Sequence, residues 1–325
     1  MLTDHARRGI LVDPTKAVPR RSTGIYGSLH DKGSTLVGLN PPPMPKQEAR
    51  VRLVDPARRL PGTVAVLAPH MDDELLACGG TLAALPSRSR VHVVWATDGS
   101  RSPAPAAPWR HPPAGLADVR EREAREALDV LGVPQENLHF LRLPDGRLRS
   151  HAAELDRALA PLLETIGPDH LLAPFRYDRH PDHLAVQRKA TAWVAGRDGR
   201  TELLEYFVYT ASRLLPRGDI RSYIRPGLLL GVDITGWSAT KRRALERYRS
   251  QTTRAYDFQR RPNLTPALLD LVCHEPELFL PYSPSMPGPA VFEGPVAYIR
   301  LAHRIEPVLK ERKDRLTALL RRPGS

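Results

Sequence analysis

The chain has 325 residues, of which 41% are hydrophobic, so it can build a sizeable buried core and is not wholly disordered. Its 48 lysine and arginine residues against 36 acidic residues give a formal net charge of +12, which favours anionic partners. Two cysteines exclude a disulfide framework, and no apolar run is long enough to span a bilayer. We find no signal-peptide pattern either, and therefore expect a cytoplasmic protein.

The domain organisation is predicted from composition and periodicity. Residues 1–60 are rich in proline, including the run Pro41-Pro42-Pro43, and lack sustained periodicity, which indicates a surface arm. Residues 61–255 carry the regular patterns, and we assign them to one catalytic domain. Residues 256–325 are expected to form a C-terminal extension that packs on this domain.

Strand-like and helical patterns alternate from residue 62 onward. Strands are predicted at residues 63–68, 91–97, 138–143, 170–175, 203–209 and 228–234. Helices are predicted at residues 118–131, 150–166 and 184–195. This alternation predicts an α/β fold with a mostly parallel sheet and helices on both faces. After residue 250 the pattern is weaker, with a helix at 265–273, a strand at 297–302 and a basic amphipathic helix at 307–322.

Two clusters of histidine and aspartate follow predicted strands. The first, His70-Met71-Asp72-Asp73-Glu74, ends the apolar run of residues 64–68. Three adjacent carboxylates repel one another and lose solvation when enclosed, so we expect a compensating cation. The second, His180-Pro181-Asp182-His183, follows the strand at residues 170–175. Because parallel strands end at one edge of a sheet, the two clusters can converge on a divalent metal.

A metal held by His70, Asp73 and His183 would leave positions open for water and for a substrate oxygen. Such a centre acidifies water and polarises a carbonyl, as amide hydrolysis requires. Asp72 is then placed to act as the base and His180 to donate to the developing oxyanion. Asp182 could hold the imidazole of His180 in a useful tautomer.

The motif from Pro69 to Glu74 resembles the (A/P)HPDDE motif of the PIG-L/LmbE-like N-acetylglucosaminyl deacetylases, and His180-Pro181-Asp182-His183 resembles their HPDH motif. The resemblance extends over about residues 62–250. Weaker matches to the family pattern are Thr97-Asp98-Gly99, Arg120 with Glu123, Leu143-Pro144-Asp145-Gly146, and Lys241 with Tyr248, Ser250 and Gln251. Met71 stands where the family usually has proline.

The resemblance implies a Rossmann-like α/β fold, a zinc(II) or iron(II) site, and removal of an N-acetyl group from an amino sugar. It assigns the metal to His70, Asp73 and His183, the general base to Asp72, and the oxyanion donor to His180 backed by Asp182. Arg120 and Asp145 fall where related sugar deacetylases contact substrate hydroxyls. The structural alternatives are an ion pair of Arg120 with Glu123 and a plain Asp-Gly turn at Asp145.

Three functions are compatible with these patterns. We expect a metal-dependent deacetylase that acts on a small N-acetylglucosamine-like conjugate, and the basic charge favours an anionic aglycone. An amidase that cleaves another acyl group from an amino-sugar or amino-acid conjugate would carry the same motifs. A basic polyanion-binding protein with a vestigial metal site would explain the charge, but no nucleic-acid-binding motif is present, so we expect no nucleic-acid partner. The patterns carry no signal for an oligomeric state.

Overall fold

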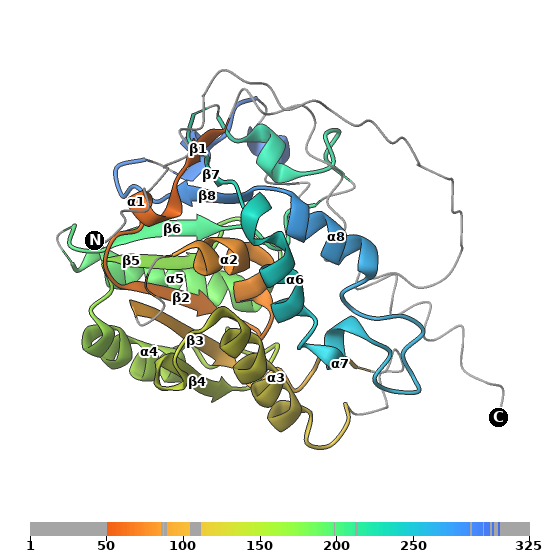
Figure 1. Ribbon diagram of the computed structural model, residues 1–325. Coiled ribbons are helices and arrows are strands. Elements are labelled where there is room, and N and C mark those ends of the chain that lie inside the picture. The colour runs from red at the N-terminus through yellow and green to blue at the C-terminus, as the bar shows by residue number, and fades with distance from the viewer. Residues whose placement is uncertain are drawn as a thin grey trace, which may run out of the picture. The chain divides into compact units, whose positions relative to one another are not determined.

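The computed structural model describes residues 51–85, 87, 90–104, 112–197, 199–211, 214–225, 227–286, 288–294, 296–299, 301 and 305. Within these residues, eight strands form one sheet in the order β1-β7-β8-β6-β5-β2-β3-β4 (Figure 1). The strands are β1 (Arg52–Val54), β2 (Val64–Ala68), β3 (Val91–Thr97), β4 (Leu138–Leu143), β5 (His170–Pro174), β6 (Glu202–Tyr206), β7 (Leu230–Val232) and β8 (Glu277–Pro281). Only β8 pairs antiparallel among them, so the predicted mostly parallel sheet is confirmed.

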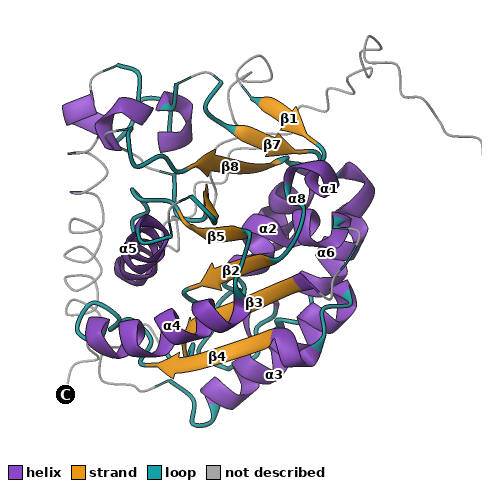
Figure 2. Cartoon of the chain, turned by 90° about the vertical axis from the view of Figure 1, so that its left-hand side faces the viewer, coloured by secondary structure: helices purple, strands orange, loops and turns teal. Residues whose placement is uncertain are grey.

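Helices cover both faces of the sheet, as Figure 2 shows. They are α1 (Pro56–Arg59), α2 (Asp73–Ala84), α3 (Leu116–Leu131), α4 (Ala152–Ile166), α5 (Pro181–Ala195), α6 (Ser238–Leu245), α7 (Arg249–Thr252) and α8 (Pro266–His274). The central strand β2 is buried along its whole length and serves two cores. Val64 and Val66 pack with α2, α3, α6 and α8, whereas Ala65 and Leu67 pack with α4 and α5. This two-sided burial explains why β2 is an unbroken apolar run. No helix in the described part of the chain has the length and apolarity to cross a membrane.

The predicted helix ends agree with the structure where glycine supplies a left-handed residue. Gly132 ends α3 with φ 74° and Gly167 ends α4 with φ 57°. Each of these glycines donates its backbone N–H to a carbonyl of the helix that it closes. Glycine adopts this conformation without the steric cost that other residues incur, so both stop signals could be read from the sequence.

The structure differs from the sequence prediction at both ends of the described chain. Residues 52–54, which we assigned to the arm, form β1 and pair with β7. Residues 277–281, which we assigned to the extension, form β8 and lie between β6 and β7. The sheet therefore continues through both expected domain boundaries. Residues 296–299 are helical, so the predicted strand at 297–302 is wrong; a short apolar run does not distinguish the two structures. Residues 1–50 of the expected arm and the expected basic helix at 307–322 lie outside the described residues.

A buried ion pair joins β8 to the helices on one face of the sheet. Lys241 on α6 is fully buried, and its Nζ lies 2.7 Å from Glu277 Oε1 at the start of β8. The same ammonium group donates to the carbonyls of Leu76 on α2 and Val272 on α8. The Glu277 carboxylate also accepts two backbone N–H groups of α2 at 2.7 Å each. The pair therefore fixes α2, the helix that begins at the first motif.

We predict that Lys241→Met lowers the free energy of unfolding by about 3–5 kcal/mol, because it leaves the Glu277 carboxylate buried without its cation. Urea unfolding of the whole chain measures the change. The matched control is Lys189→Met, which breaks a 3.1 Å ion pair to Asp156 whose side chains are 25% and 61% exposed. That pair should contribute less than about 1 kcal/mol. An equal loss in the two variants would contradict a structural role of the buried pair.

Candidate metal centre and active site

The two sequence motifs meet at the carboxyl edge of the sheet. His70 follows β2 and His180 follows β5, and these two strands are parallel neighbours. The ring centroids of His70 and His180 lie 4.6 Å apart, and those of His70 and His183 lie 5.3 Å apart. The chain continues from β2 to β3 on one side, while β5 lies on the other side of β2. Ligand sites in open α/β sheets lie where the strand order reverses in this way.

Asp73 lies between the imidazoles of the two motifs. Its Oδ2 atom is 3.2 Å from His70 Nδ1 and 3.1 Å from His183 Nε2. Two donors bound to one tetrahedral zinc at about 2.1 Å lie about 3.4 Å apart. The spacing of these three side chains therefore fits donors to a common cation.

The hydrogen bonding of His183 supports the same fit. Its ring is fully buried, with Nδ1 3.2 Å from Asp178 Oδ2, so the ring proton is expected on Nδ1. In the neutral form of the ring, Nε2 then presents a lone pair, and it makes no hydrogen bond within the described residues. Burial lowers the pKa of His183, but the carboxylates of Asp178 and Asp73 outweigh burial and raise it to about 9. An arrangement that binds a proton so firmly also suits a divalent metal.

Two other sets of side chains could contribute donors to a cation. The ligand atoms of His70, His180 and His183 lie within 4.8 Å of one another, as do those of His70, Asp145 and Asp182. Both sets contain His70. The ligand set His70, Asp73 and His183 therefore stays a prediction, with His180 close enough to compete for the same ion.

Asp72 occupies a strained position at the turn between β2 and α2. It is the N-cap residue of α2, with φ 125° and ψ −26°, and its side chain makes no capping hydrogen bond. Its Oδ2 atom lies 3.4 Å from Arg120 Nη2. Burial raises the pKa of Asp72 to about 7; Arg120 opposes this shift, and the charges of Asp73 and Glu74 add to it. A carboxyl group with this pKa suits proton transfer near neutral pH.

The structure corrects the expected role of the Asp182 side chain. Its carboxylate accepts the backbone N–H groups of Gly146 at 2.7 Å and Leu148 at 3.0 Å, and lies 3.3 Å from His70 Nε2. Asp182 contacts His180 through its backbone N–H, which donates to His180 Nδ1 at 3.3 Å. The reason is that α5 begins at Pro181, so His180 is the N-cap residue and the Asp182 carboxylate is turned toward the β4–α4 loop.

Arg120 is not in the ion pair that we considered as its structural alternative. Its Nη2 donates to the carbonyl of Met71, and its Nε and Nη1 are buried without a hydrogen-bond partner among the described residues. Glu123 instead accepts the backbone N–H and the hydroxyl of Ser250 at 2.7 Å each. The guanidinium of Arg120 is therefore directed at the first motif and not at Glu123.

Asp145 is also more than a turn residue. Its Oδ1 lies 3.3 Å from His70 Nε2, and its Oδ2 accepts the backbone N–H of Arg101 at 3.0 Å. Burial raises the pKa of this carboxyl, but the hydrogen bond and charge of His70 outweigh burial and lower it to about 2. Asp145 is therefore an ionised group beside the imidazole of the first motif.

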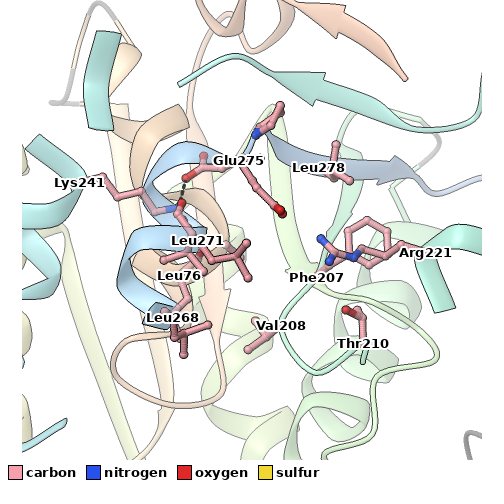
Figure 3. A pocket seen from close by; sticks show the side chains of 14 residues that line it. Leu76, Phe207, Val208, Thr210, Arg221, Lys241, Leu268, Leu271, Glu275 and Leu278 are labelled. Carbon is pink, nitrogen blue, oxygen red and sulfur yellow. Dashed lines mark hydrogen bonds and ion pairs between the residues drawn. The ribbon is translucent and has the colours of Figure 1, made fainter. Parts of the chain in front are cut away.

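A cavity of about 360 Å³ opens at these residues. Its lining includes His70, Asp72, Arg101, Arg120, Asp145, His180, Tyr209, Gln251 and Asn263. A second cavity, of about 70 Å³, is lined by apolar side chains together with Arg221, Lys241 and Glu275 (Figure 3). Leu76 on α2 lines both cavities. The predicted catalytic and substrate-binding residues other than Asp182 line the larger cavity.

Sequence reasoning missed two residues that support the second motif. Asp178 is buried and accepts the backbone N–H groups of His180 at 2.8 Å and Tyr209 at 3.1 Å, besides facing His183. The ring of Tyr209 stacks on His180 with centroids 5.6 Å apart. An aspartate two residues before the motif was the available signal for Asp178; Tyr209 gave none, because it follows a different strand.

Comparisons with known proteins identify the family of this chain. Residues 65–194 match the PIG-L family, described as GlcNAc-PI de-N-acetylase. The chain is 30% identical over 213 residues to the 2'-N-acetylparomamine deacetylase of Streptomyces fradiae. The aligned region covers 59% of this chain and 74% of that protein. The chain therefore belongs to the PIG-L family, as its two motifs indicated.

Solved structures show the same fold. The N,N'-diacetylchitobiose deacetylase of Pyrococcus horikoshii is similar with a TM-score of 0.51 and 22% identity, over 73% of this chain and 89% of that one. A deacetylase of teicoplanin biosynthesis is similar with a TM-score of 0.50 and 18% identity, over 67% and 97% of the two chains.

We predict that Asp178→Asn weakens metal binding by about 10- to 100-fold, because the orientation and basicity of His183 depend on the carboxylate at its Nδ1. Metal content after dialysis against buffers of defined free zinc measures the change. Asp219→Asn is the control: Asp219 is equally buried but pairs with Arg221, which lines the smaller cavity. Its zinc affinity should equal that of the unchanged protein. Unaltered affinity in Asp178→Asn would show that His183 is not oriented by this carboxylate, or is not a ligand.

Proposed function

We propose that this protein is a metal-dependent hydrolase that removes the N-acetyl group from an N-acetylglucosamine-like sugar conjugate. The observation that carries the proposal is the close approach of Asp73 Oδ2 to His183 Nε2, beside the carboxylate of Asp72, which does not cap α2. A carboxylate and an imidazole 3.1 Å apart can bind a divalent cation in place of the proton between them, and the Asp72 carboxylate supplies a base next to it. The named relative in Streptomyces fradiae is a deacetylase, which supports the reaction class.

The proposed ligands are His70, Asp73 and His183, and the proposed ion is zinc(II) or iron(II). When bound there, the metal would polarise the amide carbonyl and acidify a water molecule. Asp72 takes the proton of the attacking water, because its carboxylate lines the cavity and is not used to cap α2.

His180 is proposed to stabilise the oxyanion. The backbone N–H of Asp182 donates to His180 Nδ1, so the neutral ring carries its proton on Nε2. This tautomer provides a hydrogen-bond donor in the cavity, where negative charge develops on the amide oxygen. The backbone contact thus performs the orienting role that the Asp182 carboxylate was expected to have.

The volume and the lining residues of the larger cavity indicate the class of substrate. A volume of about 360 Å³ suits a small sugar conjugate. Arg120 and the ionised carboxylate of Asp145 both line this cavity, where they are proposed to provide a donor and an acceptor for sugar hydroxyls. Arg101 is exposed and lines the same cavity, which supports an anionic aglycone such as a phosphate.

We predict that Asp72→Asn lowers kcat by about 10²- to 10⁴-fold, since it removes the base while keeping the shape of the side chain. Acetate release from a panel of N-acetyl sugars measures kcat, with metal content determined on the same samples. Asp156→Asn, at a position that is 61% exposed, should keep full activity. Undiminished turnover in Asp72→Asn would remove this residue from the role of base. Faster release of longer acyl groups than of acetate would instead favour the broader amidase.

A second prediction concerns the aglycone. Arg101→Gln should raise KM for an N-acetylglucosamine phosphate by about tenfold, because a hydrogen bond between charged groups is lost. KM for an uncharged N-acetylglucosamine glycoside should stay the same in this variant. Arg157→Gln, at a side chain that is 76% exposed on α4, is the control for net charge. Equal changes for both substrates would argue against recognition of an anion by Arg101.

A further inference from the structure

The backbone at Asp72 adopts a conformation that non-glycine residues rarely occupy. Its φ is 125°, and Arg142 at φ 52° is the other non-glycine residue with positive φ in the described part of the chain. Such strain persists only where surrounding interactions hold the backbone in place. The neighbours of the Met71–Asp72 peptide group show what holds it.

Both polar atoms of this peptide group are bound by buried ionic side chains. The carbonyl of Met71 accepts a hydrogen bond from Arg120 Nη2. The N–H of Asp72 donates to Glu74 Oε2 at 3.1 Å. Arg120 is 1% exposed and Glu74 is fully buried, so water does not compete for either contact. The plane of the peptide group is thereby fixed from both sides.

Glu74 is itself held by two aromatic side chains. Trp95 Nε1 on β3 donates to Glu74 Oε2 at 2.9 Å, and the Tyr248 hydroxyl donates to Glu74 Oε1 at 2.5 Å. The ring of Tyr248 also lies under the Arg120 guanidinium, whose Cζ is 5.6 Å from the ring centroid. Tyr248 therefore contacts both Glu74 and Arg120. Trp95, Arg120 and Tyr248 lie on elements far apart in the sequence, and they converge on one peptide group.

We propose that Glu74, held by Tyr248 and Trp95, acts with Arg120 as a clamp on the Met71–Asp72 peptide group, and that this clamp directs the Asp72 carboxylate into the cavity. Glu74 and Tyr248 are then positioning residues, which act on the reaction through Asp72. This inference rests on the proposed function, in which Asp72 is the base. It goes beyond that function by assigning a task to the last acid of the first motif and to Tyr248.

The test compares two buried tyrosines. Tyr248→Phe removes the hydroxyl that holds Glu74, and Tyr206→Phe removes an equally buried hydroxyl that donates to the carbonyl of Leu67 on β2 at 2.7 Å. We expect Tyr248→Phe to lower kcat by about tenfold, since a small misplacement of a catalytic group is costly. KM for the N-acetyl sugar and bound zinc should not change. Tyr206→Phe should keep kcat.

Two variants of Glu74 extend the test. Glu74→Gln keeps one acceptor oxygen for Asp72 and Trp95 but replaces the oxygen that accepts from Tyr248 by an amide NH2 group, so we expect a smaller loss of kcat than in Glu74→Met. Glu74→Met removes the acceptor and should lose more activity than Tyr248→Phe. Equal kcat in Tyr248→Phe and Tyr206→Phe, or a loss of kcat that follows a loss of zinc, would overturn the clamp.

A crystal structure of Tyr248→Phe gives a readout that does not depend on turnover. The clamp predicts that the Met71–Asp72 peptide group rotates and that φ of Asp72 moves away from its positive value. An unchanged turn would refute the clamp even if no sugar of the panel is hydrolysed. Asp72→Asn, assayed in parallel, separates the two ideas. Full activity in that variant would refute the proposed base, whereas loss there with full activity in Tyr248→Phe would refute the clamp alone.

Discussion

The enclosure of several carboxylates at one edge of the sheet is the constraint on which the rest of the site depends. A buried carboxylate is tolerated only when hydrogen bonds or opposite charge replace its lost hydration. Asp178 and Asp182 each accept two backbone N–H groups, and Glu74 accepts three donors. Asp73 accepts one backbone N–H, from His70, and otherwise faces two imidazoles. Burial raises the pKa of Asp73, but the charges and hydrogen bonds of these two imidazoles outweigh burial and lower it. The charge of this carboxylate is thus balanced by side chains of the two motifs and not mainly by the backbone.

The position of Asp72 lowers the stability of helix α2. An aspartate at the N-cap position usually accepts a backbone N–H of the first turn, and losing such a contact costs about 1 kcal/mol. Asp72 makes no such bond and has a strained φ. The acids at the next two positions of α2 lie where the helix dipole favours negative charge, which offsets part of this loss. The chain therefore keeps the Asp72 carboxylate available to the cavity at the expense of local stability.

The region beyond the family match completes both the sheet and the site. The match ends at residue 194, whereas β8 lies inside the sheet and Lys241 fixes α2 to it. Tyr248 reaches back to Glu74, and Asn263 lines the cavity. Residues after 194 thus supply part of the cavity wall and the support of the first motif, so they are a natural place for differences in specificity between family members.

The sequence by itself determined the mostly parallel α/β fold, the central strands, and the six histidine and aspartate residues of the two motifs that meet at the sheet edge. These follow from local patterns, because apolar periodicity marks buried strands and helices, and parallel strands end at a common edge. The tertiary structure alone decided the place of β8, the hydrogen-bond partners of Asp178 and Glu74, and the direction of the Asp182 carboxylate. Each of these depends on partners distant in the sequence or on which way a side chain leaves its helix. Packing sets such contacts, and the local pattern of residues does not encode them.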